Sequence, residues 1–189
     1  MNGEPIFERV CAALLEKLRG DLEAVMVNTR DGIKLSHPGA EEDFQLGVYL
    51  YDMEEVRSNG PPRPVRLNEQ ERRLPDLELA LRLMIFANRN VAFNAMGAED
   101  EIRLLEAAVR SMHSITELET EVERVRVSFQ ALTQAEKVSL WQSMNCPFQS
   151  AVYVDLQPVS IPSTRILRVP PVREISAPVV PEEGGTGRL

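Results

Sequence analysis

Histidine and cysteine are rare in this chain, and its many serines and acidic residues show no spacing typical of a catalytic or metal site. The two histidines, His37 and His113, have no second ligand at zinc-binding spacing, since no H-x-x-x-H, C-x-x-C or E-x-x-H pattern occurs. No serine lies in a G-x-S-x-G turn. The glycine-rich stretch 184–187 lacks the lysine of a phosphate-binding loop. The sequence therefore predicts no catalytic residue, no cofactor and no metal site.

The charge of the chain narrows the choice of partners. The 189 residues carry a net charge of −8, with 26% charged and 43% hydrophobic residues, which is typical of one globular domain with a tail. No basic run is present, so the sequence disfavours nucleic acid, whose phosphates need a basic face, and an anionic membrane surface.

The cysteines and the apolar runs predict the cellular compartment of the chain. Cys11 shares a predicted helix face with apolar residues, and the only other cysteine is Cys146. Two cysteines so placed favour a reducing cytoplasm without a structural disulfide. The N-terminus lacks the basic start of a signal peptide, and the most apolar run, residues 79–87, is too short to span a bilayer and contains Arg82.

Hydrophobic periodicity predicts an α+β fold with a mainly antiparallel sheet of about five strands packed with three helices. Apolar residues at helical spacing predict helices at 4–18, ended by Gly20, at 99–113, and after Thr133. β-prone or alternating runs predict strands at 22–28, 44–53, 77–86, 123–131 and 152–161. The leucine alternation of 77–86 predicts a central or near-central strand.

Two of these elements carry specific predictions about which side chains are buried. The helix at 99–113 is expected to bury Ile102, Leu105, Ala108 or Val109, and Met112. In the last strand Val152, Val154 and Leu156 are expected to point one way, and Tyr153, Asp155, Gln157, Val159 and Ile161 the other.

The stretch 132–161 reads as a helix, a turn and a strand. Thr133 and Glu136 have the spacing of a capping box. Val138 or Leu140, Trp141 and Met144 then form an apolar stripe, and Pro147 is expected to end the helix. Trp141, the only tryptophan, is expected to be a core anchor.

Two segments lack regular periodicity. Residues 54–76 are rich in turn formers and predict a surface excursion long enough to touch a partner. Residues 163–189 contain four arginines and three glutamates, a net charge of +1, so residues 1–162 carry −9. We therefore expect a domain at 1–162 and a Pro-rich extended arm with a flexible tail at 163–189. The arm can add a strand to another subunit's sheet, or be disordered, as we expect for the last ten residues.

The order of several segments resembles one family. The segments that carry the resemblance are VYLY at 48–51, LPDLELAL at 74–81, LLEAAVRSMH at 104–113, the predicted helix at 132–141, and PFQSAVY at 147–153. In this order they are similar to the cap, or tail-terminator-like, protein of extracellular contractile injection systems, the phage-tail-like particles of the antifeeding-prophage and virulence-cassette type. The resemblance covers about residues 5–161.

The resemblance implies a structural protein and not an enzyme. Such a protein forms a homo-hexameric ring at the baseplate-distal end of the particle, where it contacts the inner tube protein and the sheath protein. It is assembled in the cytoplasm and leaves as part of the particle on lysis. The candidate partner contacts are Arg57, Asn59, Arg63 and Arg66 in the loop, and Arg165, Arg168 and Arg173 in the arm. Trp141, Pro147 and Tyr153 are expected to be structural anchors.

Two alternatives remain open at this point. The same role fits the terminator of a contractile phage tail or bacteriocin. A more remote alternative is a small-ligand-binding or catalytic α+β domain whose acidic surface binds a cation or substrate, which a large thermal stabilisation by metals or nucleotides would favour.

Overall fold

The computed structural model of the chain describes residues 5–26, 28–56, 64–68, 70–89, 97–120 and 123–168. The chain divides into two compact units. The first comprises Met1–Pro61 and Asp76–Pro162, and the second comprises Pro62–Pro75 and Ser163–Leu189. Each unit is therefore built from segments that are far apart in the sequence.

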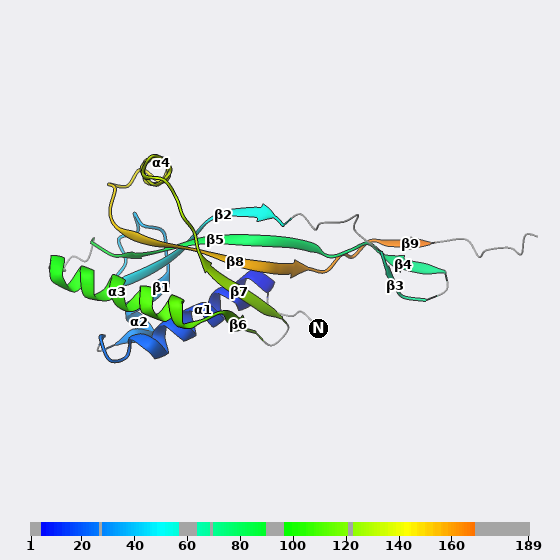
Figure 1. The fold of residues 1–189 in the computed structure, drawn as a ribbon, viewed down its shortest axis with the longest axis horizontal. Coiled ribbons are helices and arrows are strands. Elements are labelled where there is room, and N and C mark those ends of the chain that lie inside the picture. The colour runs from blue at the N-terminus through cyan, green and yellow to red at the C-terminus, as the bar shows by residue number, and fades with distance from the viewer. Residues whose placement is uncertain are drawn as a thin grey trace, which may run out of the picture. The chain divides into compact units, whose positions relative to one another are not determined.

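A six-stranded sheet is the framework of the first unit within the described residues (Figure 1). Its order is β1-β2-β5-β8-β7-β6, with bounds Ile33–Leu35 for β1, Leu46–Glu55 for β2, Leu77–Ala87 for β5, Ala151–Ile161 for β8, Arg124–Phe129 for β7 and Glu117–Glu119 for β6. Neighbouring strands are antiparallel, except β1 and β2, which are parallel. The predicted central position of strand 77–86 is confirmed, because β5 lies between β2 and β8.

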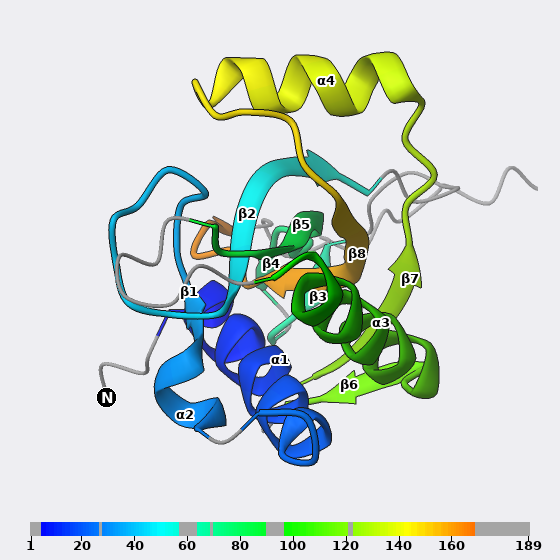
Figure 2. The ribbon, with the colours of Figure 1, turned by 90° about the vertical axis from the view of Figure 1, so that its left-hand side faces the viewer.

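Helices cover both faces of this sheet. Helices α1 (Ile6–Leu22) and α3 (Ala98–Ser114) lie on one face, and α4 (Gln134–Ser143) lies on the opposite face (Figure 2). The short helix α2 (Thr29–Gly32) follows α1 and leads directly into β1. The sheet therefore separates two layers of apolar side chains.

The larger hydrophobic core lies between the sheet and the α1–α3 pair. Helix α1 buries one face, which consists of Val10, Cys11, Leu14, Leu15, Leu18 and Leu22. These side chains share one cluster with fully buried residues of the sheet such as Leu83, Ile85 and Val154. Burial raises the pKa of the Cys11 thiol to about 11, so the thiol stays protonated at neutral pH. Both cysteines are free.

A polar contact connects the two helices of this layer. The Oδ2 atom of Asp21 in α1 accepts a hydrogen bond from Ser111 Oγ in α3 at 2.6 Å, and Lys17 Nζ donates to Oδ1 at 2.7 Å. Burial alone would raise the pKa of Asp21, but the hydrogen bonds from Lys17 and Ser111 outweigh it and hold that pKa below its ordinary value. The ionised carboxylate is therefore the form that joins α1 to α3.

Gly47 in β2 lets the sheet pack closely on the aromatic side. A Cβ atom at this position would lie 2.3 Å from Cζ of Phe86 and 2.9 Å from Cε2 of Phe44. Any side chain would displace these two rings, so glycine is required here by the close approach.

The coarse α+β prediction is confirmed, whereas several details are wrong. The described residues contain a six-stranded sheet and four helices, in place of about five strands and three helices, and one strand pair is parallel. Strands β1 and β6 were not predicted, because each has only three residues and is too short to show a hydrophobic alternation. The described residues of 22–28 form no strand, since Leu22 still belongs to α1 and a turn follows it. Gly20 does not end α1, which continues to Leu22.

Two predictions of side-chain direction are also wrong. Ile102 is 64% exposed, because α3 turns Leu104 toward the sheet in its place. The predicted burial of Met112 is confirmed, and of the two alternatives Ala108 and Val109, Ala108 is the buried one. Val159 is fully buried in the larger core with Val154, although simple alternation places the two on opposite faces. A register shift in the β5–β8 pairing between Leu79 and Leu81 reverses the alternation beyond that point.

Candidate functional site

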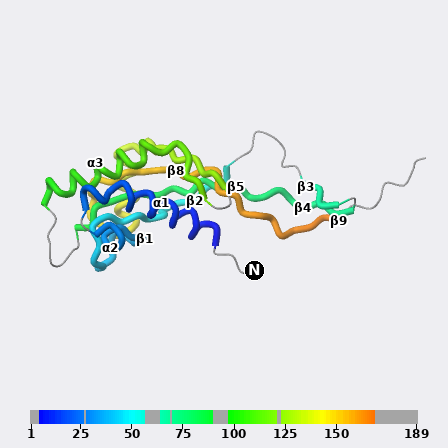
Figure 3. Tube along the Cα trace, turned by 90° about the horizontal axis from the view of Figure 1, so that it is seen from below, coloured from blue at the N-terminus to red at the C-terminus, as the bar shows by residue number. Residues whose placement is uncertain are grey.

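The second unit contains a small three-stranded antiparallel sheet. Its order is β3-β4-β9, with bounds Val65–Arg66, Glu71–Arg73 and Ile166–Arg168 (Figure 3). The turn between β3 and β4 is held by Asn68, whose Oδ1 accepts from the backbone N of Gln70 at 2.9 Å and of Glu71 at 2.7 Å. Residues 166–168 of the arm thus pair with a strand of their own chain.

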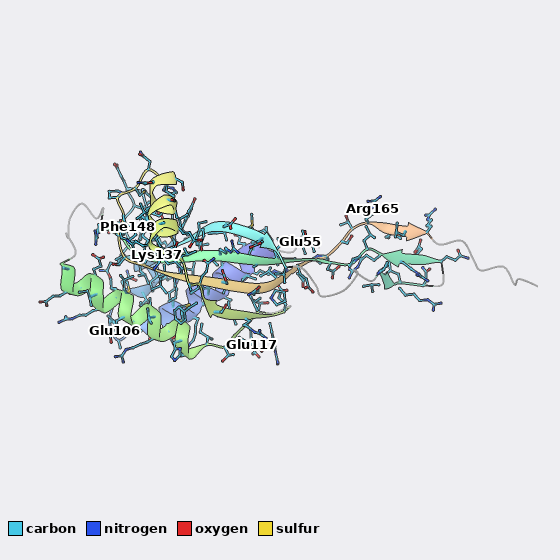
Figure 4. All side chains as sticks on the ribbon, turned by 45° about the horizontal axis from the view of Figure 1, so that its top comes forward. Glu55, Glu106, Glu117, Lys137, Phe148 and Arg165 are labelled. Carbon is cyan, nitrogen blue, oxygen red and sulfur yellow. The ribbon has the colours of Figure 1, made fainter. Side chains whose placement is uncertain are left out.

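Three arginines share one face of this small sheet. Arg66 lies directly opposite Arg72, and Arg72 lies opposite Leu167. The backbone N of Leu74 donates to the carbonyl oxygen of Arg165 at 3.0 Å, which continues the pairing by one step. Because side chains alternate along a strand, Arg165 falls on the same face as Leu167. Figure 4 labels Arg165 next to β9. We call Arg66, Arg72 and Arg165 the arginine face.

The arginine face is exposed and carries no compensating carboxylate within the described residues. All three side chains are exposed, and two like charges stand directly opposite each other, which is unfavourable for the isolated sheet. The contact of Arg66 is with a backbone carbonyl, from its Nε to Asn68 O at 3.3 Å. On the other face, by contrast, Arg168 Nε lies 3.9 Å from Glu71 Oε1.

The two units have opposite net charges. The second unit has eight arginines and five glutamates, a net charge of +3, while the whole chain carries −8. The first unit therefore carries −11. A positive surface on one part of the chain and a negative surplus on the other favour association between oppositely charged surfaces.

Part of this negative surplus gathers on the sheet face that carries α4. Arg82 in β5 pairs in register with Asp52 of β2 and Asp155 of β8. Its Nη1 donates to Asp52 Oδ2 at 2.8 Å, its Nη2 contacts Glu54, and its Nε lies 3.9 Å from Asp155 Oδ1. We call Asp52, Glu54 and Asp155 the carboxylate cluster. One guanidinium serves three carboxylates, so the group has a net charge of −2.

Burial and the neighbouring charges shift the pKa values of Asp155 and Arg82. Burial raises the pKa of Asp155, Arg82 opposes this rise, and the carboxylates of Glu54 and Asp52 add to it. Burial would lower the pKa of Arg82, but the hydrogen bond to Asp52 and the nearby carboxylates raise it. The side chains of Asp52 and Glu54 are 48% and 61% exposed, so a second cation can reach them from outside.

Trp141 is the main side chain that packs helix α4 on the same sheet face, with Leu140 partly buried beside it. It is the only buried residue of the helix and is 1% exposed. Its Nε1 donates to the hydroxyl of Tyr153 at 2.9 Å, and its ring stands edge-on to Phe86 at a centroid distance of 6.2 Å. Phe44 and Met84 complete this second cluster. The predicted partners of Trp141 in the stripe, Val138, Leu140 and Met144, are only partly buried.

The ends of α4 are set by local sequence. The predicted capping box is confirmed, since Glu136 N donates to Thr133 Oγ1 at 3.3 Å and Thr133 N donates to Glu136 Oε2 at 2.7 Å. The helix does not run to the proline as expected. It ends at Ser143, and Asn145 takes a left-handed conformation with φ 56°, so Pro147 lies in the exposed segment that follows.

The structure places some of the predicted contact residues. Arg66 lies in β3, Arg165 directly precedes β9, and Arg168 lies in β9. The other four, Arg57, Asn59, Arg63 and Arg173, lie outside the described residues. Sequence reasoning missed Arg72 and the carboxylate cluster. The available signal was a charged residue inside an apolar strand, Arg82, but its partners depend on the register of β2 and β8.

Neither a metal site nor a membrane-spanning helix is evident among the described residues. They contain no group of three or more His, Cys, Asp or Glu residues that could hold a metal ion. No helix among them is long and apolar enough to cross a membrane.

Comparisons with known proteins agree with this fold. Residues 9–174 match the family model of the Pvc16 N-terminal domain. One similar solved structure is the PVC sheath/tube terminator of an extracellular contractile injection system in its extended state, with a TM-score of 0.52 and 15% identity over 95% of this chain and 67% of that chain. Another is the tube terminating cap of the anti-feeding prophage, with a TM-score of 0.57 and 16% identity over 87% of this chain and 59% of that chain. No curated protein matches the sequence.

Proposed function

The chain belongs to the family of the Pvc16 N-terminal domain, and on this premise we propose that it is a structural cap protein of a contractile phage-tail-like particle. It forms a homo-hexameric ring at the baseplate-distal end, where it terminates and stabilises the inner tube and the sheath. The observation that carries this proposal is the shared fold, which spans 95% and 87% of the chain in two solved terminator structures.

The physical features of the chain support an assembly role. A closed ring needs a heterologous interface, in which two different surfaces of each copy meet. The chain offers two such surfaces of opposite charge, the arginine face and the carboxylate cluster. The first unit also has a continuous core between the sheet and α1–α3, so it can serve as a rigid building block. In this role the protein binds tube and sheath subunits and transforms no substrate.

Removal of the chain from cells that produce the particle tests the proposal directly. Electron microscopy should then show abnormally long tails or tails with open distal ends, and a plasmid-borne wild-type copy should restore capped tails of normal length. Particles of normal length with closed ends in the deletion strain would refute the proposal.

Binding of the purified chain tests the partners. The full chain should co-sediment with assembled tube or sheath protein, and a chain that lacks residues 164–189 should bind more weakly, because this deletion removes β9 and Arg165 and Arg168. The truncated chain should retain the circular dichroism of the first unit. A full chain that binds neither tube nor sheath would count against the cap role, and a truncation that unfolds the first unit would make 163–189 part of its core.

A further inference from the structure

The two charged surfaces of the chain are each incomplete. The arginine face has three positive charges that lack a carboxylate among the described residues, and the carboxylate cluster keeps two negative charges after Arg82 is counted. We propose that the arginine face of one copy binds the carboxylate cluster of a second copy. This inference rests on the proposed ring, for which it supplies the contact between neighbouring copies.

The spacing of the groups fits this contact. Arg66 and Arg72 are direct cross-strand neighbours, so their Cβ atoms lie about 5 Å apart. Asp52 and Glu54 are two residues apart on one strand and both contact Arg82, which places them about 7 Å apart on one face. Guanidinium groups bind carboxylates through two parallel hydrogen bonds. Two arginines can therefore meet two carboxylates in parallel.

The composition of the arginine face also fits a protein surface. Leu167 lies beside Arg72 on this face and is 38% exposed, so the contact has an apolar element between its charges. Arginine is favoured over lysine at protein interfaces because its planar group bonds in a fork and is weakly hydrated. The five basic residues of the described second unit are all arginines.

A second copy suits the arginine face better than a nucleic acid does. A polyanion that approaches the chain meets a first unit with a net charge of −11 and is repelled. A second copy presents its carboxylates at one defined place, the carboxylate cluster, where the arginine face can bind them. Because the two surfaces differ, the contact is head-to-tail, which is the kind that closes into a ring.

Charge reversal in two separate full-length variants tests the contact. One variant carries Arg66→Glu and Arg72→Glu, and the other carries Asp52→Arg and Glu54→Arg. Each alone should raise the dissociation constant for self-association at least about tenfold, or about 1.4 kcal/mol, in sedimentation velocity. An equimolar mixture should restore association, since each reversed surface then meets its complement. The matched control is Arg103→Glu on α3, which should associate as the wild type does.

Several outcomes would overturn the inference. These are a wild-type chain that stays monomeric from about 0.05 M to about 0.5 M salt, a mixture that fails to associate, and a control that loses association equally. Binding of duplex DNA through Arg72 in place of self-association would overturn it as well. If Asp52→Arg with Glu54→Arg unfolds the chain, Asp52→Asn with Glu54→Gln must still weaken association. Normal capping of particles by both reversed variants would overturn this contact and leave the cap role intact.

Discussion

Replacement of Trp141 by alanine is predicted to lower the free energy of unfolding by about 3–5 kcal/mol. Trp141 is 1% exposed, so its side chain removes about 200 Å² of surface from water. At about 25 cal/mol per Å² this burial is worth ~5 kcal/mol. Alanine retains a part of the burial, while the cavity and the lost hydrogen bond to Tyr153 add to the loss. These opposing corrections leave the loss within the stated range.

The structure also predicts where the loss appears. Because Trp141 is the only buried residue of α4, the helix should detach locally while the larger core stays closed. Amide protons of residues 134–143 should then exchange faster than those of β5 and β8. Trp141→Phe keeps an aromatic ring and should cost less than alanine. Tyr153→Phe leaves the indole N–H buried without its acceptor and should cost about 1–3 kcal/mol.

The assay is urea denaturation followed by far-UV circular dichroism. Tryptophan fluorescence cannot be used, since the chain has one tryptophan and the variant removes it. Hydrogen exchange read by mass spectrometry gives the local result for α4. A loss below about 1 kcal/mol, with the protection of α4 unchanged, would refute the reasoning that Trp141 holds the helix to the sheet.

Three further changes give predictions of different kinds. Gly47→Ala should lower the free energy of unfolding by about 1–3 kcal/mol, because the new Cβ clashes with an aromatic ring. Gly20 is a helical glycine with open space around it, so Gly20→Ala should instead raise the free energy of unfolding by about 0.5–1 kcal/mol in the same denaturation experiment. The lowered pKa of Asp21 means that its stabilising contribution is present above its ordinary pKa and is lost as the pH falls below about 4. Melting temperatures across this range should show a steeper acid decline for wild type than for Asp21→Asn, and equal slopes would contradict the role of the Ser111 contact. Thr133→Ala should cost about 1 kcal/mol through the lost cap, whereas Thr133→Ser should be nearly neutral.

The elements with long and regular patterns could be predicted from the sequence. The leucine alternation of 77–86 found β5 and its central position, and the spacing of Thr133 and Glu136 found the start of α4. These signals are local, because a strand's alternation and a helix cap depend on neighbours within a few residues. The family resemblance used the same segments, and the family match at residues 9–174 agrees with it.

The features that failed prediction depend on partners distant in the sequence. The buried direction of Val159 depends on a register shift in the β5–β8 pairing, which no pattern within β8 reveals. The exposure of Ile102 depends on which side of α3 meets the sheet, and both sides offer apolar residues. The arginine face likewise exists only because β4 pairs with both β3 and β9. Tertiary pairing, and not composition, created each of these.

Strand β5 is a partition shared by two separate interiors. From Leu83 to Ala87 every side chain is fully buried, with Leu83 and Ile85 in the larger core and Met84 and Phe86 in the cluster around Trp141. A backbone shift that relieves crowding on one side must create it on the other. In a saturation mutagenesis screen the exposed end of β2, at Met53 and Glu55, should tolerate substitution, whereas this stretch should show no tolerant position. During neutral evolution, amino-acid substitutions should therefore appear last at residues 83–87.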